Sequence, residues 1–177
     1  MKTNNTVLIV AAACIALAAC SKKNVKDDNT GNSGTSAPSS ATTQPTGPTN
    51  TGGGRYTPAD LDTDTCLRQR VVYFDLDQDT LKPEFRAIVD CHAKYLIDRP
   101  MARVTLEGNA DERGSREYNV ALGERRGNAV MSAVRGGGAS GTQMNVVSYG
   151  EERPVCTESN EDCWAKNRRV EFIYTAK

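Results

Sequence analysis

The segment RVTLEGNADERGSREYNVALGERRGNAV, residues 103–130, joins a strand pattern to a long helix pattern through a short charged turn. Its first six residues alternate polar and apolar side chains, which is typical of a strand with one buried face. Ser115 stands where the N-cap of the following helix is expected. The turn between the two elements carries Asp111, Glu112 and Arg113, whose charges either hold the turn together or contact a ligand.

Three further strand patterns and one further helix pattern surround this unit. VVYFDLD at 71–77 is β-branched and then acidic, which predicts a strand running into a loop, and residues 145–150 and 169–175 predict two more strands. Apolar side chains recur at helical spacing from Leu81, and Pro100 closes that helix. The predicted order is β-α-β-α-β, then an irregular loop bounded by cysteines, and then a last strand.

This order of elements predicts the fold class. Two amphipathic helices need a sheet to cover their apolar faces. We therefore expect an α/β fold of the α+β type, a two-layer β-α-β-α-β-β sandwich with two main helices packed on one face of a mixed four-stranded sheet. Short connections and right-handed crossovers predict parallel neighbours among the first strands.

The N-terminal residues do not fit into this domain. A short basic start is followed by an apolar run at 7–19, which is too short to cross a hydrocarbon core of roughly 30 Å at about 1.5 Å per residue. It predicts a secretory signal peptide over residues 1–19. The sequence LAAC at its end resembles the lipobox of bacterial lipoproteins, which implies lipidation of Cys20, and Ser21 next to it resembles outer-membrane-destined lipoproteins. An ordinary signal peptide with a chance cysteine is the alternative.

A tether is expected between the leader and the domain. Residues 27–54 contain no large apolar side chain, so this stretch cannot bury enough surface to offset its ordering entropy. We expect a disordered tether rich in Ser, Thr, Pro and Gly over residues 20–55, and a single domain over residues 56–177. The whole chain has 22 Lys and Arg against 22 Asp and Glu, which gives no sign of a polyanionic partner such as nucleic acid.

Four cysteines remain in the expected domain once the lipobox cysteine is set aside. They are Cys66, Cys91, Cys156 and Cys163. An even set in an oxidising compartment favours disulfides. We expect Cys156–Cys163 to close a loop and Cys66–Cys91 to tie the start of the domain to its first helix, although three pairings are open. Metal binding is the weaker alternative, because there is no CxxC pair and His92 is the single histidine, itself expected to be a structural or surface residue; no metal or cofactor is expected.

Arg126 interrupts the apolar stripe of the helix expected between Ser115 and the glycines at 136–138. At about 100° per residue, the stripe consists of Tyr118, Leu122, Ala129 and Ala133, with Val130 at its edge. A guanidinium on an apolar face needs an anion or must reach out to solvent, and Asp111 in the preceding turn is the nearest candidate. The two charges either pair with each other and fix the turn, or form a site for a zwitterion such as an amino acid, beside a helix N-terminus that favours anions.

Four segments taken together resemble one known family. They are VVYFDLD, GNADERGSREYNVALGERRGNAV, VVSYGEERP and KNRRVEF. Over about residues 70–174 the chain is similar to the outer-membrane-protein-A-like C-terminal domain family, and within it to the peptidoglycan-associated lipoproteins of the Tol–Pal system. The resemblance implies an outer-membrane lipoprotein whose domain faces the periplasm and binds the peptidoglycan stem peptide non-covalently through its diaminopimelate residue. It also implies Tol-system partners, especially the periplasmic propeller protein, and a role in envelope integrity and cell division.

The resemblance also assigns site residues. Asp111 would receive the ammonium group of the ligand, and Arg126 would take a carboxylate by a bidentate contact. The other family positions at the pocket fall on Phe74, Asp75, Ala110 and Arg168. Glu112 and Arg113 are expected to be charges at the rim or facing a partner.

The chain departs from the family pattern in three respects. Asn109 stands where the family usually has histidine, and it cannot titrate near neutral pH. Gly127 replaces a common alanine, which by helix propensity alone weakens the helix by up to about 1 kcal/mol. The four cysteines of the domain are not a family requirement.

Two other functional classes remain as alternatives. An enzyme that cleaves glycans needs two acids at a set separation across one bond, and Asp111 and Glu112 are sequence neighbours, which is a poor start for that geometry. We therefore expect no enzymatic activity. A module whose main partner is another envelope protein, with peptidoglycan binding secondary, stays open.

Overall fold

The computed structural model describes residues 54–177. The helices are α1 Asp60–Thr63, α2 Arg86–Asp98, α3 Arg116–Gly136 and α4 Glu161–Asn167, with 3₁₀ turns at Pro83–Phe85 and Gly141–Gln143. The strands are β1 Val71–Tyr73, β2 Arg103–Asn109, β3 Met144–Gly150 and β4 Arg169–Ala176. The expected signal peptide, the lipidation site at Cys20 and nearly all of the expected tether lie outside the described residues.

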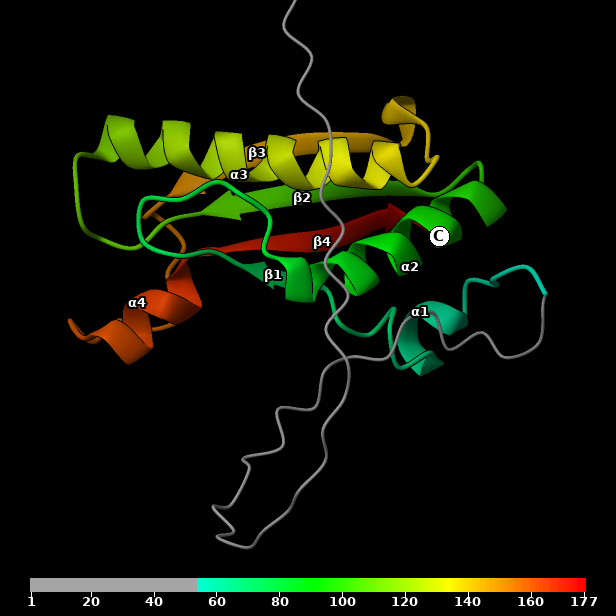
Figure 1. Cartoon of the computed structure of the whole chain (residues 1–177), viewed down its shortest axis with the longest axis horizontal. Coiled ribbons are helices and arrows are strands. Elements are labelled where there is room, and N and C mark those ends of the chain that lie inside the picture. The colour runs from blue at the N-terminus through cyan, green and yellow to red at the C-terminus, as the bar shows by residue number, and fades with distance from the viewer. Residues whose placement is uncertain (1–53) are drawn as a thin grey trace, which may run out of the picture. The chain divides into compact units, whose positions relative to one another are not determined.

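The four strands form one mixed sheet in the order β1-β4-β2-β3. β2 and β3 are parallel, whereas β4 is antiparallel to both of its neighbours. Helices α2 and α3 cover the same face of this sheet (Figure 1). The predicted two-layer α/β sandwich with a mixed four-stranded sheet is confirmed.

The expectation of parallel neighbours among the first strands is correct for β2 and β3 and wrong for β1 and β2. The last strand lies between β1 and β2. Val170 and Phe172 of β4 are fully buried, so this strand belongs at the centre of the sheet, where both of its edges are paired. The rules that favour right-handed crossovers leave room for such a late insertion, because they restrict handedness and not strand order.

Three local elements differ from the expectation. The first strand ends at Tyr73, because the carbonyl groups that follow it accept hydrogen bonds from arginine side chains instead of a neighbouring strand. Helix α1 has no counterpart in the sequence prediction. The cysteine-bounded loop before β4 contains α4, which Asn160 caps by accepting a hydrogen bond from the backbone N–H of Cys163 at 3.0 Å.

Helix α3 begins and ends where the sequence predicts. Ser115 caps it by accepting a hydrogen bond from the backbone N–H of Tyr118, and its last residue is Gly136. The predicted buried stripe is partly wrong. The buried residues of α3 are Asn119, Leu122, Gly123, Arg126, Gly127, Val130 and Val134. The helix therefore turns Gly123 and Gly127 towards the sheet, because residues without a side chain allow the closest approach.

Both expected disulfides are present. Cys66 and Cys91 are joined with a sulfur–sulfur distance of 2.00 Å, and Cys156 and Cys163 with one of 2.09 Å. Cys66 and Cys91 are buried, so their disulfide fastens the segment before β1 to α2 inside the core. Among residues 54–177, no cluster of three or more His, Cys, Asp or Glu side chains is arranged to hold a metal ion.

His92 is a core residue, which confirms its structural role. Its ring stacks on Phe172 with 4.1 Å between ring centroids, and its two nitrogens contact the Tyr174 hydroxyl at 2.9 Å and the Gln69 carbonyl at 3.0 Å. Burial lowers the pKa of His92 from 6.5 to about 4, against a smaller opposing effect of the Gln69 hydrogen bond. The side chain is therefore neutral at neutral pH.

We expect the free energy of unfolding to fall as the pH drops from about 6.5 to about 4. In this window the unfolded chain takes up a proton at His92 that the folded chain excludes, so acid favours unfolding. At roughly 1.4 kcal/mol per pKa unit, the loss approaches about 3 kcal/mol. Urea unfolding at pH 7.0 and pH 4.0 measures it. His92→Gln, which does not titrate, should lose much less stability over the same window, and an equal loss in both proteins would contradict the assignment to His92.

Candidate functional site

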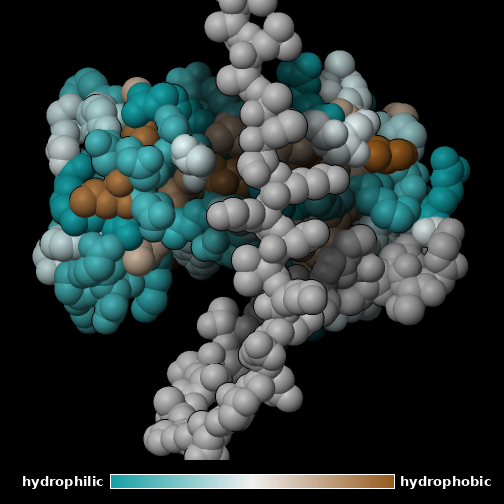
Figure 2. All heavy atoms as spheres, in the orientation of Figure 1, coloured by the Kyte–Doolittle hydropathy of each residue, from teal (hydrophilic) through white to brown (hydrophobic). Residues whose placement is uncertain are grey.

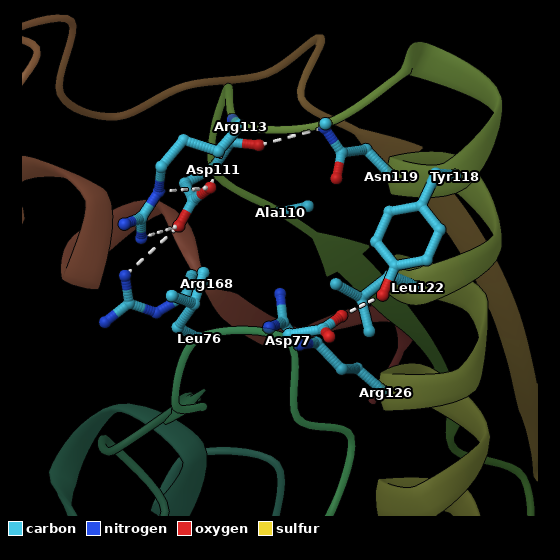
Figure 3. Close-up of a pocket in the computed structure, with 11 residues that line it drawn as sticks. Leu76, Asp77, Ala110, Asp111, Arg113, Tyr118, Asn119, Leu122, Arg126 and Arg168 are labelled. Atoms are coloured by element: carbon cyan, nitrogen blue, oxygen red, sulfur yellow. Dashed lines mark hydrogen bonds and ion pairs between the residues drawn. The ribbon is translucent and has the colours of Figure 1, made fainter.

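A cavity of about 320 Å³ lies at the C-terminal end of β2, between the loop after β1, the start of α3 and the residue that precedes β4. Four of the six residues that the sequence assigns to a pocket line it. They are Ala110, Asp111, Arg126 and Arg168. Figure 3 shows Arg113 and Arg168 both directed at the Asp111 carboxylate, with Arg126 on α3 across the cavity. Segments that lie far apart in the chain therefore converge at the predicted charged turn.

Asp111 is the negative centre of the cavity. Its carboxylate is 4% exposed and accepts hydrogen bonds from Arg113 Nη2 at 2.7 Å, Arg113 Nε at 3.2 Å and Arg168 Nη1 at 3.1 Å. Burial alone raises the pKa of Asp111, but the hydrogen bonds from the two arginines outweigh it and hold the pKa below its usual value. The carboxylate is therefore ionised at neutral pH, between two guanidinium groups.

Arg126 has a different set of partners from the one that the sequence suggests. Within residues 54–177 no ion pair joins it to Asp111, so the alternative in which these two charges pair with each other and fix the turn is wrong. The fully buried guanidinium donates to the carbonyls of Gln78 at 2.8 Å, Asn109 at 2.9 Å and Asp75 at 3.0 Å. Two of these carbonyls lie in the loop after β1 and one at the end of β2, and a planar group with five N–H donors can serve all three.

The charge of Arg126 persists in this setting. Burial, and then the neighbouring charge of Arg168, lower the pKa of Arg126 to about 10, which leaves it protonated at neutral pH. Three of its five N–H groups are used by backbone carbonyls. The side chain also lines the cavity, and two of its five N–H groups make no hydrogen bond to a backbone carbonyl of residues 54–177.

Phe74 and Asp75 support the arginines and do not line the cavity. The ring of buried Phe74 lies 5.3 Å from the guanidinium carbon of Arg126, and the Phe74 carbonyl accepts from Arg168 Nε at 3.0 Å. The Asp75 carboxylate forms an ion pair with Lys82 at 2.6 Å, so only the Asp75 carbonyl serves the site. Asn109 is buried beside the site, where its side-chain amide donates to the Glu107 carbonyl at 3.0 Å.

Sequence reasoning missed two contributors to the site. Arg113, expected at the rim, contacts Asp111 directly. The signal in the sequence was the two-residue spacing between Asp111 and Arg113, which permits an Asx turn. In this turn the Asp111 carboxylate accepts from the backbone N–H of Arg113 at 3.1 Å, and the Arg113 side chain is brought back onto the same carboxylate. Tyr118, expected on the buried stripe, is 42% exposed at the cavity, and its hydroxyl donates to Asp77. Asp77 has a φ of 58°, an uncommon conformation for a residue with a side chain.

The two neighbouring acids of the turn face different partners. Glu112 accepts from the Trp164 indole N–H at 3.0 Å and from the Ser159 hydroxyl at 2.7 Å, whereas Asp111 faces the arginines. They do not form the paired arrangement that glycoside hydrolysis requires. The cavity offers one buried carboxylate and three guanidinium groups, which is a chemistry suited to binding a ligand that carries both an ammonium and a carboxylate group.

The mouth of the cavity also has an apolar part. Leu76 is 51% exposed. Figure 2 shows a mostly hydrophilic face with a cluster of apolar atoms at its left end, near the loop after β1 and the start of α3.

In the part of the chain that the structure describes, no helix is both long and apolar enough to cross a bilayer.

Comparison with known proteins identifies relatives over the whole domain. The OmpA family matches residues 73–168. The peptidoglycan-associated lipoprotein of Haemophilus influenzae is 41% identical over 167 residues, covering 94% of this chain and 95% of the relative. That of Pseudomonas putida is 50% identical over 127 residues, covering 70% and 76% of the two chains.

Comparison with solved structures also finds a peptidoglycan-associated lipoprotein with a similar fold. The crystal structure of the peptidoglycan-associated lipoprotein from Burkholderia pseudomallei has a TM-score of 0.64 at 40% identity, covering 65% of this chain and 98% of that one. The C-terminal domain of Helicobacter pylori MotB, at 19% identity and a TM-score of 0.56, shares the fold, covering 60% of this chain and 84% of that one.

Proposed function

Because the chain belongs to the OmpA family, and within it to the peptidoglycan-associated lipoproteins, we propose that its domain binds the diaminopimelate residue of the peptidoglycan stem peptide. Binding is non-covalent and involves no catalysis. The observation that carries this proposal is the Asp111 carboxylate, buried between Arg113 and Arg168 in a cavity that Arg126 also lines. An amino acid with a free ammonium and a free carboxylate matches these charges.

The roles of the residues follow from their hydrogen bonds. The ammonium of the ligand binds the Asp111 carboxylate, and the carboxylate of the ligand binds guanidinium N–H groups that backbone carbonyls leave unused. Arg126 has two such groups, and Arg113, which is 30% exposed, donates to the Asp111 carboxylate and to no backbone carbonyl of the described residues. Ala110 forms part of the cavity wall, and its backbone N–H donates to the Gly150 carbonyl at 2.7 Å. Phe74 and Asp75 act indirectly, through Arg126 and Arg168.

The wider role proposed for the protein is to tether the outer membrane to the cell wall. A lipid on Cys20 anchors the chain in the outer membrane, residues 20–55 span the gap, and the domain in the periplasm holds peptidoglycan. We also propose that it works in the Tol–Pal system during envelope maintenance and cell division, with the periplasmic propeller protein as a partner. The exposed Leu76 and Tyr118 at the mouth of the cavity favour this second interaction, because a protein partner could cover them.

Asp111→Asn is expected to reduce retention of the protein on purified peptidoglycan sacculi at least tenfold. The substitution keeps the shape of the side chain but removes the charge that meets the ligand ammonium, and a hydrogen bond to a charged group contributes roughly 1.5–3 kcal/mol. A pull-down with sacculi at increasing protein concentration measures the change. A soluble peptide that carries diaminopimelate should release the wild-type protein.

Asp90→Asn is the matched control, because it removes one exposed carboxylate on α2 and should leave retention unchanged. Circular dichroism establishes that each variant is folded. A folded Asp111→Asn protein that is retained like the wild type would exclude this site.

A further inference from the structure

Helix α4 lies against the outer side of the two arginines that hold Asp111. Glu161 accepts from Arg168 Nη2 at 2.6 Å, and its other oxygen lies 3.4 Å from Arg113 Nη2. The guanidinium carbon of Arg113 lies 4.1 Å from the centroid of a Trp164 ring. The cavity lining includes both arginines but neither Glu161 nor Trp164. Helix α4 therefore acts on the ligand site indirectly, through the two arginines that reach Asp111 and through Glu112 next to it, which accepts from the Trp164 indole N–H at 3.0 Å.

The covalent anchor of α4 is its disulfide. The helix has seven residues, and isolated helices of that length are not stable in water. Its buried residues are Cys163 and Asn167, so it contributes no large apolar side chain to the core. Cys163 is bonded to Cys156, and the Asn167 side chain closes the same loop by accepting from the N–H of Val155 at 2.9 Å and donating to the carbonyl of Cys156 at 2.7 Å.

We propose that the Cys156–Cys163 disulfide is a positioning device for the ligand site. By holding α4 in place, it keeps Glu161 and Trp164 behind the two arginines and so sets the geometry around Asp111. Glu161 and Trp164 are positioning residues that do not touch the ligand. The inference rests on the proposed function, because its consequence is the affinity for an amino acid with ammonium and carboxylate groups.

The test compares the two disulfides in the full chain. Cys156→Ser/Cys163→Ser should weaken retention on peptidoglycan sacculi by roughly tenfold, within the range measured for residues that act on a site through their neighbours. Cys66→Ser/Cys91→Ser is the control, since it removes the disulfide that joins α2 to the segment before β1. The control should unfold at a lower temperature but be retained like the wild type at temperatures where it is folded.

The position of α4 can be followed separately, because Trp164 is the only tryptophan in the chain. Its fluorescence should shift to longer wavelength in Cys156→Ser/Cys163→Ser, as the indole leaves Arg113 and enters water. Trp164→Ala should weaken retention although the disulfide is intact, whereas Trp164→Phe, which keeps a ring under Arg113, should recover most of it. These outcomes distinguish positioning from a general loss of stability.

Unchanged retention and unchanged Trp164 fluorescence in Cys156→Ser/Cys163→Ser, with a wild-type chain that binds sacculi, would overturn this inference and leave the proposed function standing. A folded wild-type chain that is not retained on sacculi at all would overturn the proposed function, and the inference with it.

Discussion

Replacing Arg126 by alanine is expected to lower the free energy of unfolding by about 4 kcal/mol. The guanidinium is fully buried and donates to three carbonyls, two in the loop after β1 and one at the end of β2. Without it, all three carbonyls lose the guanidinium as a donor, although the Asp75 carbonyl keeps the backbone N–H of Gln78 at 3.2 Å, and a cavity opens beneath α3. Urea unfolding at neutral pH measures the loss.

Two variants test the cause of this effect. Arg126→Lys keeps the charge, but a single ammonium cannot span three carbonyls, so it should restore only part of the stability. Arg125→Ala removes the neighbouring arginine, whose ion pair with Asp79 at 3.0 Å is half exposed, and should change stability by less than about 1 kcal/mol. If Arg126→Ala unfolds at the same urea concentration as Arg125→Ala, the three hydrogen bonds do not support the fold as described.

The stability of Arg126→Ala also decides how its retention on peptidoglycan sacculi should be interpreted. Loss of retention in Arg126→Ala reports folding and ligand contact together, because the same side chain serves both. Asp111→Asn reports binding far more directly, since both arginines around it can still donate to an amide oxygen. The two substitutions are therefore not equivalent tests of one charge pair.

Replacing Gly123 by alanine is expected to destabilise the domain by about 3 kcal/mol, at the upper end of the usual range for overpacking. A Cβ on Gly123 would lie 2.3 Å from the Ser148 hydroxyl oxygen and 2.9 Å from the Gly108 carbonyl oxygen. In the opposite direction, a Cβ on Gly108 would lie 1.9 Å from the carbonyl oxygen of Gly123. Backbone atoms cannot turn aside as a flexible side chain can, so α3 would have to move away from β2.

A glycine elsewhere in the same helix provides the control. Gly136 has open space around the position of an added Cβ, and Gly136→Ala should leave stability unchanged or raise it by up to about 1 kcal/mol. Thermal unfolding of the two variants makes the comparison. Equal unfolding temperatures for Gly123→Ala and Gly136→Ala would contradict a packing role for Gly123. Because α3 carries Arg126, Gly123→Ala should also reduce retention on sacculi.

Gly127 shows why helix propensity gave an incomplete account of α3. A Cβ there would lie 2.5 Å from Cγ1 of Val146, so the glycine that weakens the isolated helix also allows it to approach the sheet. Hydrophobic periodicity could not reveal this face, because glycine carries no apolar side chain to count. The orientation of α3 consequently differs from the predicted stripe, although its ends were predicted correctly.

The candidate site shows a similar division between what the sequence could predict and what it could not. Asp111 and Arg126 could be found from the chain, since a charged turn and a cation on an apolar stripe are local features. Their partners could not be found in this way. Arg168 lies 57 residues from Asp111 in the sequence and reaches it only because β4 enters the sheet beside β2. The acceptors of Arg126 are backbone carbonyls, and a sequence does not show which carbonyls will lie beside a given side chain.

The central position of β4 has a consequence for the order in which the protein can mature. The chain is made from its N-terminus, yet β4, the last strand of the described residues, is the one that joins β1 to β2. The sheet therefore cannot close until residues 169–176 have been made and are free to pair with β1 and β2. Arg168, which directly precedes that strand, completes the surroundings of Asp111 at the same moment. A chain that stops before Arg168 thus has neither a finished sheet nor a finished cavity, and the ionic surroundings of Asp111 form only once this segment joins the sheet.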